Sequence, residues 1–406
     1  MSVKDVRQFK VNYDKSKYIS ISEAESLDRR CKPQKDDVLL TKIGATFGYA
    51  SVVNSDERFQ IFVSLALLRP KKEILLPEFL ALYLNSNNNY LQFERVIKGA
   101  GVPDLHLEDI RKIKIPVPPI EIQQKIVEKF EKSYAEKKAK EAEAERLLAS
   151  VDDLVLDALG ITLPDREENT LDKRIFFTKS SEISSGRFDP HYFSPKFFGL
   201  QKILQAKNIE FVKLFSSSKK IFSGITPLSG GESYTTKELG IPFVRSGDYS
   251  IQNEIDFDDL IYLKPEIHFN LMKSSKLKRG DLLIAIVGAT IGKVGVYNYD
   301  FEANTNQAVC GIRLYEDFNP FFVQAFLLSS VGQMILDRIK RPVARANINL
   351  EEIGEMLIPK IELKRQAEIA EQVEAIYAEA KRLREEGKET LKQAKLEVER
   401  MILGEG

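Results

Sequence analysis

The feature that most constrains this 406-residue chain is an internal repeat. Residues 37–48 (DVLLTKIGATFG) match residues 281–292 (DLLIAIVGATIG) at an offset of 244. Further matches follow in the same order at an offset of 243, among them Gln123 with Gln366. An offset held to one residue over about a hundred positions indicates that the same module is present twice.

The two copies are unequal at their beginning. The second copy has extensive sequence, from about Lys173 onward, before its Gly-Ala-Thr segment, whereas the first copy has only the stretch from Met1. We therefore expect the first copy to lack roughly the first third of a module. The predicted loss includes the counterpart of residues 226–246.

Each copy ends in a segment typical of a long helix. Residues 120–159 contain no glycine or proline and lie between Pro118-Pro119 and Gly160, the usual punctuation of a helix. Mostly apolar positions along this segment are spaced alternately three and four residues apart, which predicts a heptad seam. The same seam is found in the second copy at an offset of 243. The apolar seam positions are Val127, Phe130, Tyr134, Leu148, Val151 and Val155, and then Val373, Tyr377, Leu391 and Val398.

We expect the helices over residues 120–159 and 363–403 to pack antiparallel as an intramolecular coiled coil. Each would be about 60 Å long at 1.5 Å per residue, and the pair would act as a rigid spacer between two globular parts. The polar middle of the seam would set the register at some cost in stability. Two separate amphipathic helices are the alternative.

The globular parts combine strands and short helices. Residues 281–287 are typical of a buried strand, followed by a turn and a partner strand at residues 294–297. Residues 76–84 and 319–328 are typical of short helices. The predicted fold class is α+β, with two mixed α/β modules joined by the coiled coil. The expected boundaries are 1–118 for the first module, 119–160 for the first helix, 161–361 for a linker and the second module, and 362–406 for the second helix.

Composition limits the possible classes of protein. Hydrophobic residues make up 43% of the chain, enough for real cores, and no stretch is long and apolar enough for a transmembrane helix. The two distant cysteines and the absence of an apolar leader favour a cytoplasmic protein. The 60 basic and 60 acidic residues balance, so a DNA-binding surface would have to be local.

Sequence motifs for catalysis are absent. The three histidines, His106, His191 and His268, are isolated, so the sequence predicts no metal site. It also has no phosphate-binding loop, no nucleophile elbow and no cofactor motif. One segment, residues 188–193 (FDPHYF), is similar to the base-holding loop of amino-methyltransferases, but His191 replaces the second proline.

Several motifs together resemble one family. GITP at residues 224–227, IPFVRSGD at 241–248, the Gly-Ala-Thr segments and IPVPPIEIQ at 115–123 are similar to target recognition domains of type I restriction–modification specificity subunits. The resemblance implies two target recognition domains, each reading one half of a split site in double-stranded DNA. It also implies a non-catalytic scaffold, without a cofactor, that binds two methyltransferase (modification) subunits and a restriction subunit. The short first module departs from this pattern, which puts normal reading of its half-site in question.

Candidate DNA contacts are basic and small polar residues beside the predicted turns and helix ends. They are Lys42, Thr46, Arg95, Lys98, Thr226, Arg245, Ser246, Thr290, Lys293, Arg338, Lys340, Arg341, Arg345 and Asn347. The alternative for the Gly-Ala-Thr segments is a purely structural hairpin, and for the basic segments a solvated helix end or a structural turn. For the whole chain, the alternatives are a methyltransferase with its own DNA reader and a structural coiled-coil protein.

Overall fold

The computed structural model consists of two compact units, one formed by residues 1–143 with 382–406 and the other by residues 144–381. The structure describes residues 1–14, 16–97, 101–163, 170, 175–179, 183, 187–205, 209–228, 232–341 and 347–404.

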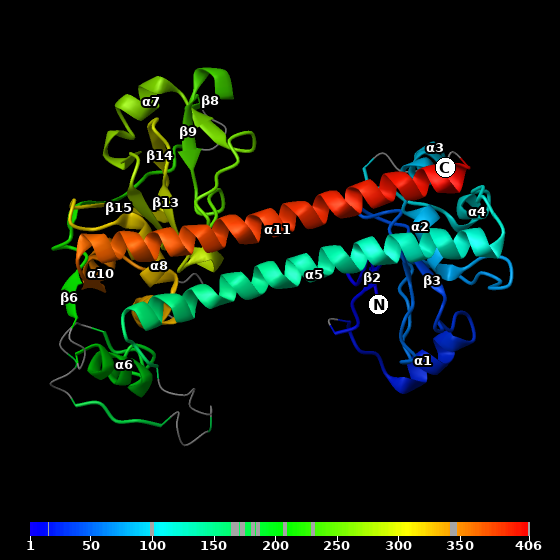
Figure 1. The fold of residues 1–406 in the computed structure, drawn as a ribbon, viewed down its shortest axis with the longest axis horizontal. Helices are drawn as coiled ribbons and strands as arrows, with labels where there is room; N and C mark the ends of the chain where they lie inside the picture. Colours follow the sequence, from blue (N-terminus) through cyan, green and yellow to red (C-terminus); the bar gives the residue numbers. More distant parts are fainter. Residues whose placement is uncertain are drawn as a thin grey trace. The chain divides into compact units, whose positions relative to one another are not determined.

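The first unit is built on a three-stranded antiparallel sheet of order β4-β3-β5. Among the described residues, a two-stranded hairpin and four short helices surround this sheet, and parts of two long helices complete the unit (Figure 1). The elements are β1 (Val6–Arg7), β2 (Lys10–Val11), α1 (Ile21–Asp28), β3 (Val38–Thr41), β4 (Ala50–Val52), β5 (Leu65–Leu68), α2 (Pro77–Leu84), α3 (Asn87–Val96), α4 (Leu107–Ile110) and α5 (Ile120–Ala158).

The second unit has the same sheet with one more strand, in the order β13-β12-β15-β7, and adds a five-stranded sheet of order β11-β14-β9-β10-β8. β6 and β16 form a separate antiparallel pair. The elements are α6 (Pro195–Gln205), β6 (Glu210–Lys213), β7 (Ser218–Ser223), β8 (Tyr234–Thr235), β9 (Ile241–Val244), β10 (Ile261–Leu263), α7 (Pro265–Phe269), β11 (Lys276–Leu277), β12 (Asp281–Ala285), β13 (Val294–Tyr297), β14 (Ala303–Thr305), β15 (Val309–Leu314), α8 (Pro320–Leu328), α9 (Ser330–Ile339), α10 (Leu350–Gly354), β16 (Leu357–Lys360) and α11 (Leu363–Leu403).

The backbone repeats as the sequence does. Residues with a positive φ angle occur in pairs at an offset of 244. Such pairs are informative because residues other than glycine rarely adopt a positive φ. Phe9 (φ 62°) corresponds to Asn253 (64°), and Asp36 (71°) to Gly280 (87°). This register puts Met1 opposite Arg245, so the first copy retains positions opposite Arg245 and Ser246, which the sequence comparison had counted as lost.

The predicted helices are confirmed as α5 and α11, which end within one residue of the expected positions. In the first unit, Val127 and Phe130 of α5 share a core cluster with Val398 and Ile402 of α11. In the second unit, Val155 of α5 shares a cluster with residues near the start of α11. Each unit thus pairs opposite ends of the two helices, which confirms the antiparallel arrangement.

The polar middle of the seam is close-packed in the first unit. Lys137 pairs with Glu141 along α5 (2.6 Å between Nζ and Oε1), and Lys140 reaches Glu386 of α11 (3.0 Å). Gly387 lies against the backbone of Lys137, where an added Cβ atom would be 3.4 Å from the Lys137 carbonyl oxygen. The absence of a side chain at position 387 therefore lets the two helices approach closely here.

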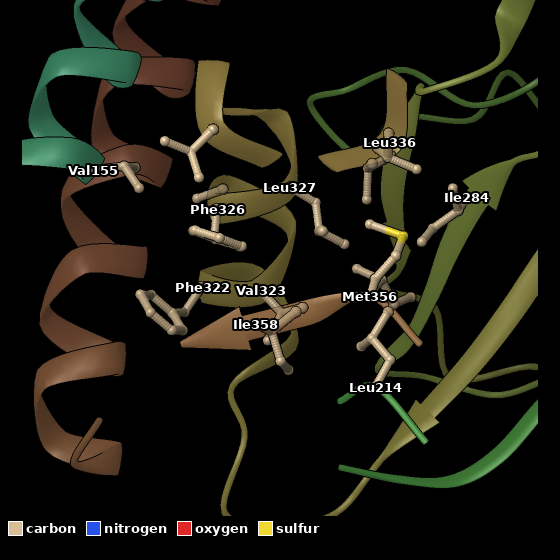
Figure 2. Close-up of a cluster of buried hydrophobic side chains, with 14 of the residues drawn as sticks. Val155, Leu214, Ile284, Phe322, Val323, Phe326, Leu327, Leu336, Met356 and Ile358 are labelled. Atoms are coloured by element: carbon tan, nitrogen blue, oxygen red, sulfur yellow. The ribbon is translucent and has the colours of Figure 1, made fainter. Parts of the chain in front are cut away.

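The largest core lies in the second unit around α8. Phe322 and Phe326 of α8 are fully buried, and Figure 2 shows Val155 of α5 on one side of this helix and Ile284 of β12 on the other. α8 therefore joins the sheet to the long helices. Truncating Phe322 to alanine would cost about 3–5 kcal/mol of unfolding free energy.

A buried glutamine fixes the start of each short core helix. Gln366 is fully buried and accepts a hydrogen bond from the backbone N–H of Asn319, the N-cap of α8 (2.8 Å), while its amide donates to the carbonyls of Asp317 (3.0 Å) and Ile361 (2.9 Å). Gln123 makes the equivalent three bonds in the first unit, with Leu76, Ile74 and Pro118. The sequence match between Gln123 and Gln366 therefore has a structural reason: both glutamines tie the start of a long helix to its module in the same way.

Among the described residues, no single helix has the length and apolar character needed to cross a membrane. The bent pair α8 and α9, taken together, has a sufficient length and apolar composition, and these are the only criteria that it meets.

Candidate nucleic-acid interface

The Gly-Ala-Thr turn of the first unit links β3 to β4 and is tied to a neighbouring loop. Thr41 at the end of β3 is buried, and its hydroxyl accepts from the backbone N–H of Tyr49 (2.9 Å). The backbone N–H of Gly44 donates to Pro103 (3.0 Å), and that of Leu105 donates to Lys42 (2.8 Å). Backbone hydrogen bonds therefore hold residues 103–105 against this turn.

The equivalent turn of the second unit links β12 to β13 through a short 3-10 segment, Gly288–Thr290. β12 and β13 pair antiparallel, so the predicted hairpin is confirmed. Gly292 has a φ of +91°, and its carbonyl accepts from the side-chain amide of Gln333 (2.9 Å). A Cβ atom here would lie 2.8 Å from the Gln333 oxygen, which explains the closing glycine.

Three loops converge beside this second turn. Thr226 hydrogen-bonds Gln307, and the adjacent Ala308 carbonyl accepts from the N–H of Ile286 at the end of β12 (2.9 Å). Asn347 forms a backbone bridge with Val287, at the same strand end. The structure thus brings the candidates Thr226, Thr290 and Asn347 to one end of the four-stranded sheet.

A second group gathers around Lys293. Its ammonium donates to the carbonyl of Ser246 (3.0 Å) and lies over the ring of Tyr249 (4.6 Å to the centroid). Burial lowers the pKa of Lys293, and Asp248 partly offsets this effect. The guanidinium of Arg245 is held by both oxygens of Asp248 (2.9 Å each). To contact a base, Arg245 would therefore have to leave an ion pair within its own loop.

The basic segment at the end of α9 is only partly available. Arg338 stacks over the rings of Tyr192 (4.7 Å) and Phe198 (5.1 Å), which is a packing role. Arg341 is about half exposed and pairs with Glu352 (3.1 Å). Lys340 is half-buried. Lys98 and Arg345 lie outside the described residues.

The first unit holds three further candidates. Lys42 is mostly buried, with its ammonium 4.0 Å from Asp104. Thr46 is half-buried, and Arg95 is exposed on the last turn of α3. Arg95 is therefore the most accessible described candidate cation of this unit.

The segment similar to a methyltransferase loop is used for packing. The ring of Tyr192 has the guanidinium groups of Arg187 (4.6 Å) and Arg338 (4.7 Å) over it, and a ring nitrogen of His191 hydrogen-bonds the carbonyl of Asp337 (2.7 Å). The aromatic ring that would hold a base in such an enzyme is therefore already in contact with two cations.

Some structural residues of the site were not predicted from the sequence. Arg187 is almost buried and joins residues 187–189 to the end of α9 and to Glu352. Asp281 and Arg313 form a two-point ion pair at the start of β12, the end of the strand away from the turn, and Asp37 and Arg69 repeat it in the first unit. The repeated Asp and Arg at an offset of 244 were a usable signal for this pair.

Comparisons with known proteins show which proteins the chain resembles. Residues 3–146 match the family model described as "Type I restriction modification DNA specificity domain". The chain is also 33% identical over 142 residues to the type I restriction enzyme EcoBI specificity subunit of Escherichia coli. That match covers 35% of this chain and spans 29% of the length of the relative.

One solved structure shares the fold of this chain, and two others were also matched. One chain, from a study of complex assembly and conformational transition of the type I R-M system, has a TM-score of 0.53 at 18% identity and covers 92% of this chain and 83% of its own. The HsdS subunit of Thermoanaerobacter tengcongensis (17% identity, TM-score 0.38) covers 92% of this chain and 82% of its own. The match to the type I restriction-modification system S subunit from M. genitalium (13% identity, TM-score 0.42) covers 92% of this chain and 83% of that subunit.

Residues 3–146 thus resemble a type I restriction modification DNA specificity domain, and the backbone repeat relates the second unit to the first. The resemblance to type I specificity subunits and the predicted α+β fold with two long helices are confirmed.

Proposed function

We propose that this chain reads a split DNA site as the specificity subunit of a type I restriction–modification complex. The observation that carries the proposal is the duplicated turn: each unit presents a Gly-Ala-Thr hairpin braced by a following loop, through Ile43 and Asp104 in one unit and Val287 and Asn347 in the other. Polar side chains on such rigid edges suit contacts to base edges and phosphates.

We further propose that the two units contribute unequally. At matched positions, Met1 of the first unit stands opposite Arg245 of the second unit, so the second unit has a basic side chain where the first unit has an apolar one. Sequence discrimination is therefore expected mainly from the second unit, while the first contributes affinity through cations such as Arg95.

The proposal includes no catalysis by the chain itself. Tyr192 is engaged in packing, and the sequence lacks a cofactor loop. Methylation and cleavage would depend on two modification subunits and a restriction subunit bound to the chain, with the long helices setting the spacing between the two reading units. The alternative enzyme would transfer a methyl group from S-adenosylmethionine without partners.

Selection from a random duplex library tests this function. The chain, assembled with its modification subunits, should enrich two short blocks separated by unspecified base pairs, and the purified chain alone should transfer no methyl group. Arg245→Ala should degrade one position in one block, and Arg95→Ala should weaken binding without altering either block. Enrichment of one continuous block, or no enrichment by the assembled complex, would contradict the proposal.

A further inference from the structure

The second unit has a cavity at a place that the first unit fills with one of its own side chains. In the first unit, the ring of Phe9 lies against the rings of Phe130 (4.5 Å between centroids) and Tyr134 (6.2 Å) of α5. The residue at an offset of 244 from Phe9 is Asn253, which has nearly the same φ angle (64° against 62°) but no ring. The Asn253 amide instead donates a hydrogen bond to Gln324 of α8 (3.0 Å), so this side chain is held against its own module.

The cavity lies where the loop that carries this asparagine meets α11. Its volume is about 320 Å³, within the usual range of small-molecule sites, about 300–1,000 Å³. Tyr299, Phe321 and Tyr377 line it with aromatic rings. The positions matched to Tyr299 and Phe321 in the first unit hold Ser55 and Glu78. The second unit therefore lacks the internal ring but has two aromatic walls that the first unit does not have.

Two polar groups of the cavity are unsatisfied. The side-chain amide nitrogen of Gln252 is buried and has no hydrogen-bond partner among the described residues. In the same part of the chain, no hydrogen bond or ion pair involves the carboxylate of Glu374, whose pKa is raised by partial burial and by Glu371. Lys381 and Glu254, which also line the cavity, pair with each other (2.5 Å). The cavity thus offers an unused hydrogen-bond donor and an unpaired negative charge.

The first unit shows which groups complement such a place. Lys395 lies over the ring of Phe9 (5.5 Å from Nζ to the centroid), and its ammonium donates to the side chain of Gln8 (2.9 Å), the match of Gln252. An aromatic ring and an ammonium group thus lie together here. In the second unit, the residue at an offset of 243 from Lys395 is Asp152. The matched residues of the second unit therefore supply neither the ring nor the ammonium.

We propose that the cavity of the second unit binds a small aromatic amine. The ring of the ligand would lie against Tyr377, as the ring of Phe9 lies against Tyr134 in the first unit. The ammonium would pair with Glu374, and an acceptor on the ligand would meet the amide of Gln252. Aromatic faces and a carboxylate together are a suitable environment for such a cation. A bound ligand would join the loop to α11 as the phenylalanine ring joins its loop to α5.

Titration of the full chain with tyramine tests this site, because tyramine combines a phenol ring, an ammonium group and a hydroxyl acceptor. In saturation-transfer NMR, we expect saturable binding with a Kd of about 1 mM or tighter. Butylamine, which has the charge without the ring, should not compete. Glu374→Gln should weaken binding at least about tenfold, because it removes the partner of the ammonium. Glu131→Gln, the matched change in the first unit, should leave binding unchanged.

A second variant fills the cavity instead of discharging it. Asn253→Phe restores the ring that the first unit has, at a φ angle that Phe9 already adopts, and should also weaken tyramine binding at least about tenfold. This change removes the hydrogen bond to Gln324, so circular dichroism and thermal unfolding are measured alongside. Glu374→Gln lies on an exposed part of α11 and decides the matter even if Asn253→Phe does not fold.

Three results would overturn the proposal. One is the absence of saturable binding up to about 10 mM tyramine, tenfold above the expected Kd. Another is unchanged affinity in Glu374→Gln or in folded Asn253→Phe. The third is competition by butylamine as effective as that by unlabelled tyramine, which would show that only the charge of the amine is bound.

Discussion

The buried glutamine at the start of α11 is expected to hold the second module to the long helix. Gln366 makes three hydrogen bonds to backbone groups and is fully buried. Gln366→Leu keeps a similar volume but leaves one N–H and two carbonyls unpaired. At about 1 kcal/mol for each bond, the local cost is about 3 kcal/mol.

Hydrogen exchange followed by mass spectrometry measures this cost locally. A loss of about 3 kcal/mol corresponds to roughly 100-fold faster exchange of the Asn319 amide, since 1.4 kcal/mol is a factor of ten. Gln123→Leu should produce the same acceleration at Leu76 in the first unit. Gln372→Leu, at an exposed position of α11, serves as the matched control and should change stability by less than about 0.5 kcal/mol.

The reasoning would be refuted if Asn319 in Gln366→Leu exchanged within about threefold of the wild-type rate, because a difference of that size is under 1 kcal/mol. It would equally be refuted if the exposed control Gln372→Leu accelerated Asn319 to the same extent.

Further predictions concern DNA binding, the coiled coil and pH. Arg341→Ala should weaken DNA binding and reduce its salt dependence in fluorescence anisotropy, whereas an unchanged slope would mean that Arg341 meets no phosphate. Arg245→Ala should cost about 1–3 kcal/mol of discrimination at one base pair, and equal loss on all sequences would argue against base reading. Val398→Asp buries an unpaired carboxylate and should lower the unfolding midpoint in urea far more than Leu396→Asp on the exposed face; equal midpoints would contradict the packing of α5 on α11. Burial lowers the pKa of Lys395; Glu399 opposes this shift and Lys137 adds to it. At pH values between the lowered pKa and the ordinary pKa of a lysine, the unfolded chain therefore binds more protons than the folded chain. The stability of the wild type relative to Lys395→Met should therefore rise with pH across that window, as urea unfolding at about pH 8 and about pH 10 can check; a flat difference would refute it.

The long helices and the turns were predictable because their signals are local. A glycine-free heptad stretch between prolines and Gly160 defines α5 to within a residue, and Gly-Ala-Thr-Ile-Gly defines the hairpin between β12 and β13. Such signals depend on backbone geometry within a few residues.

The candidate contacts were harder to judge because their state depends on tertiary neighbours. Arg338 looked like a solvent-exposed cation, but Tyr192, distant in sequence, lies under its guanidinium. Arg245 could have been judged better, since Asp248 stands three residues away and is well placed to pair with it.

The division of the chain also affects the order in which it can fold during synthesis. The second unit is one continuous stretch, residues 144–381, whereas the first unit combines residues 1–143 with residues 382–406. On a ribosome, residues 1–143 emerge before the second unit. Val127 and Phe130, however, pack against Val398 and Ile402, which are translated after the whole second unit. The unit whose synthesis begins first is therefore completed only after the second unit has been made, and until then it presents an uncovered apolar seam on which a nascent-chain chaperone would act.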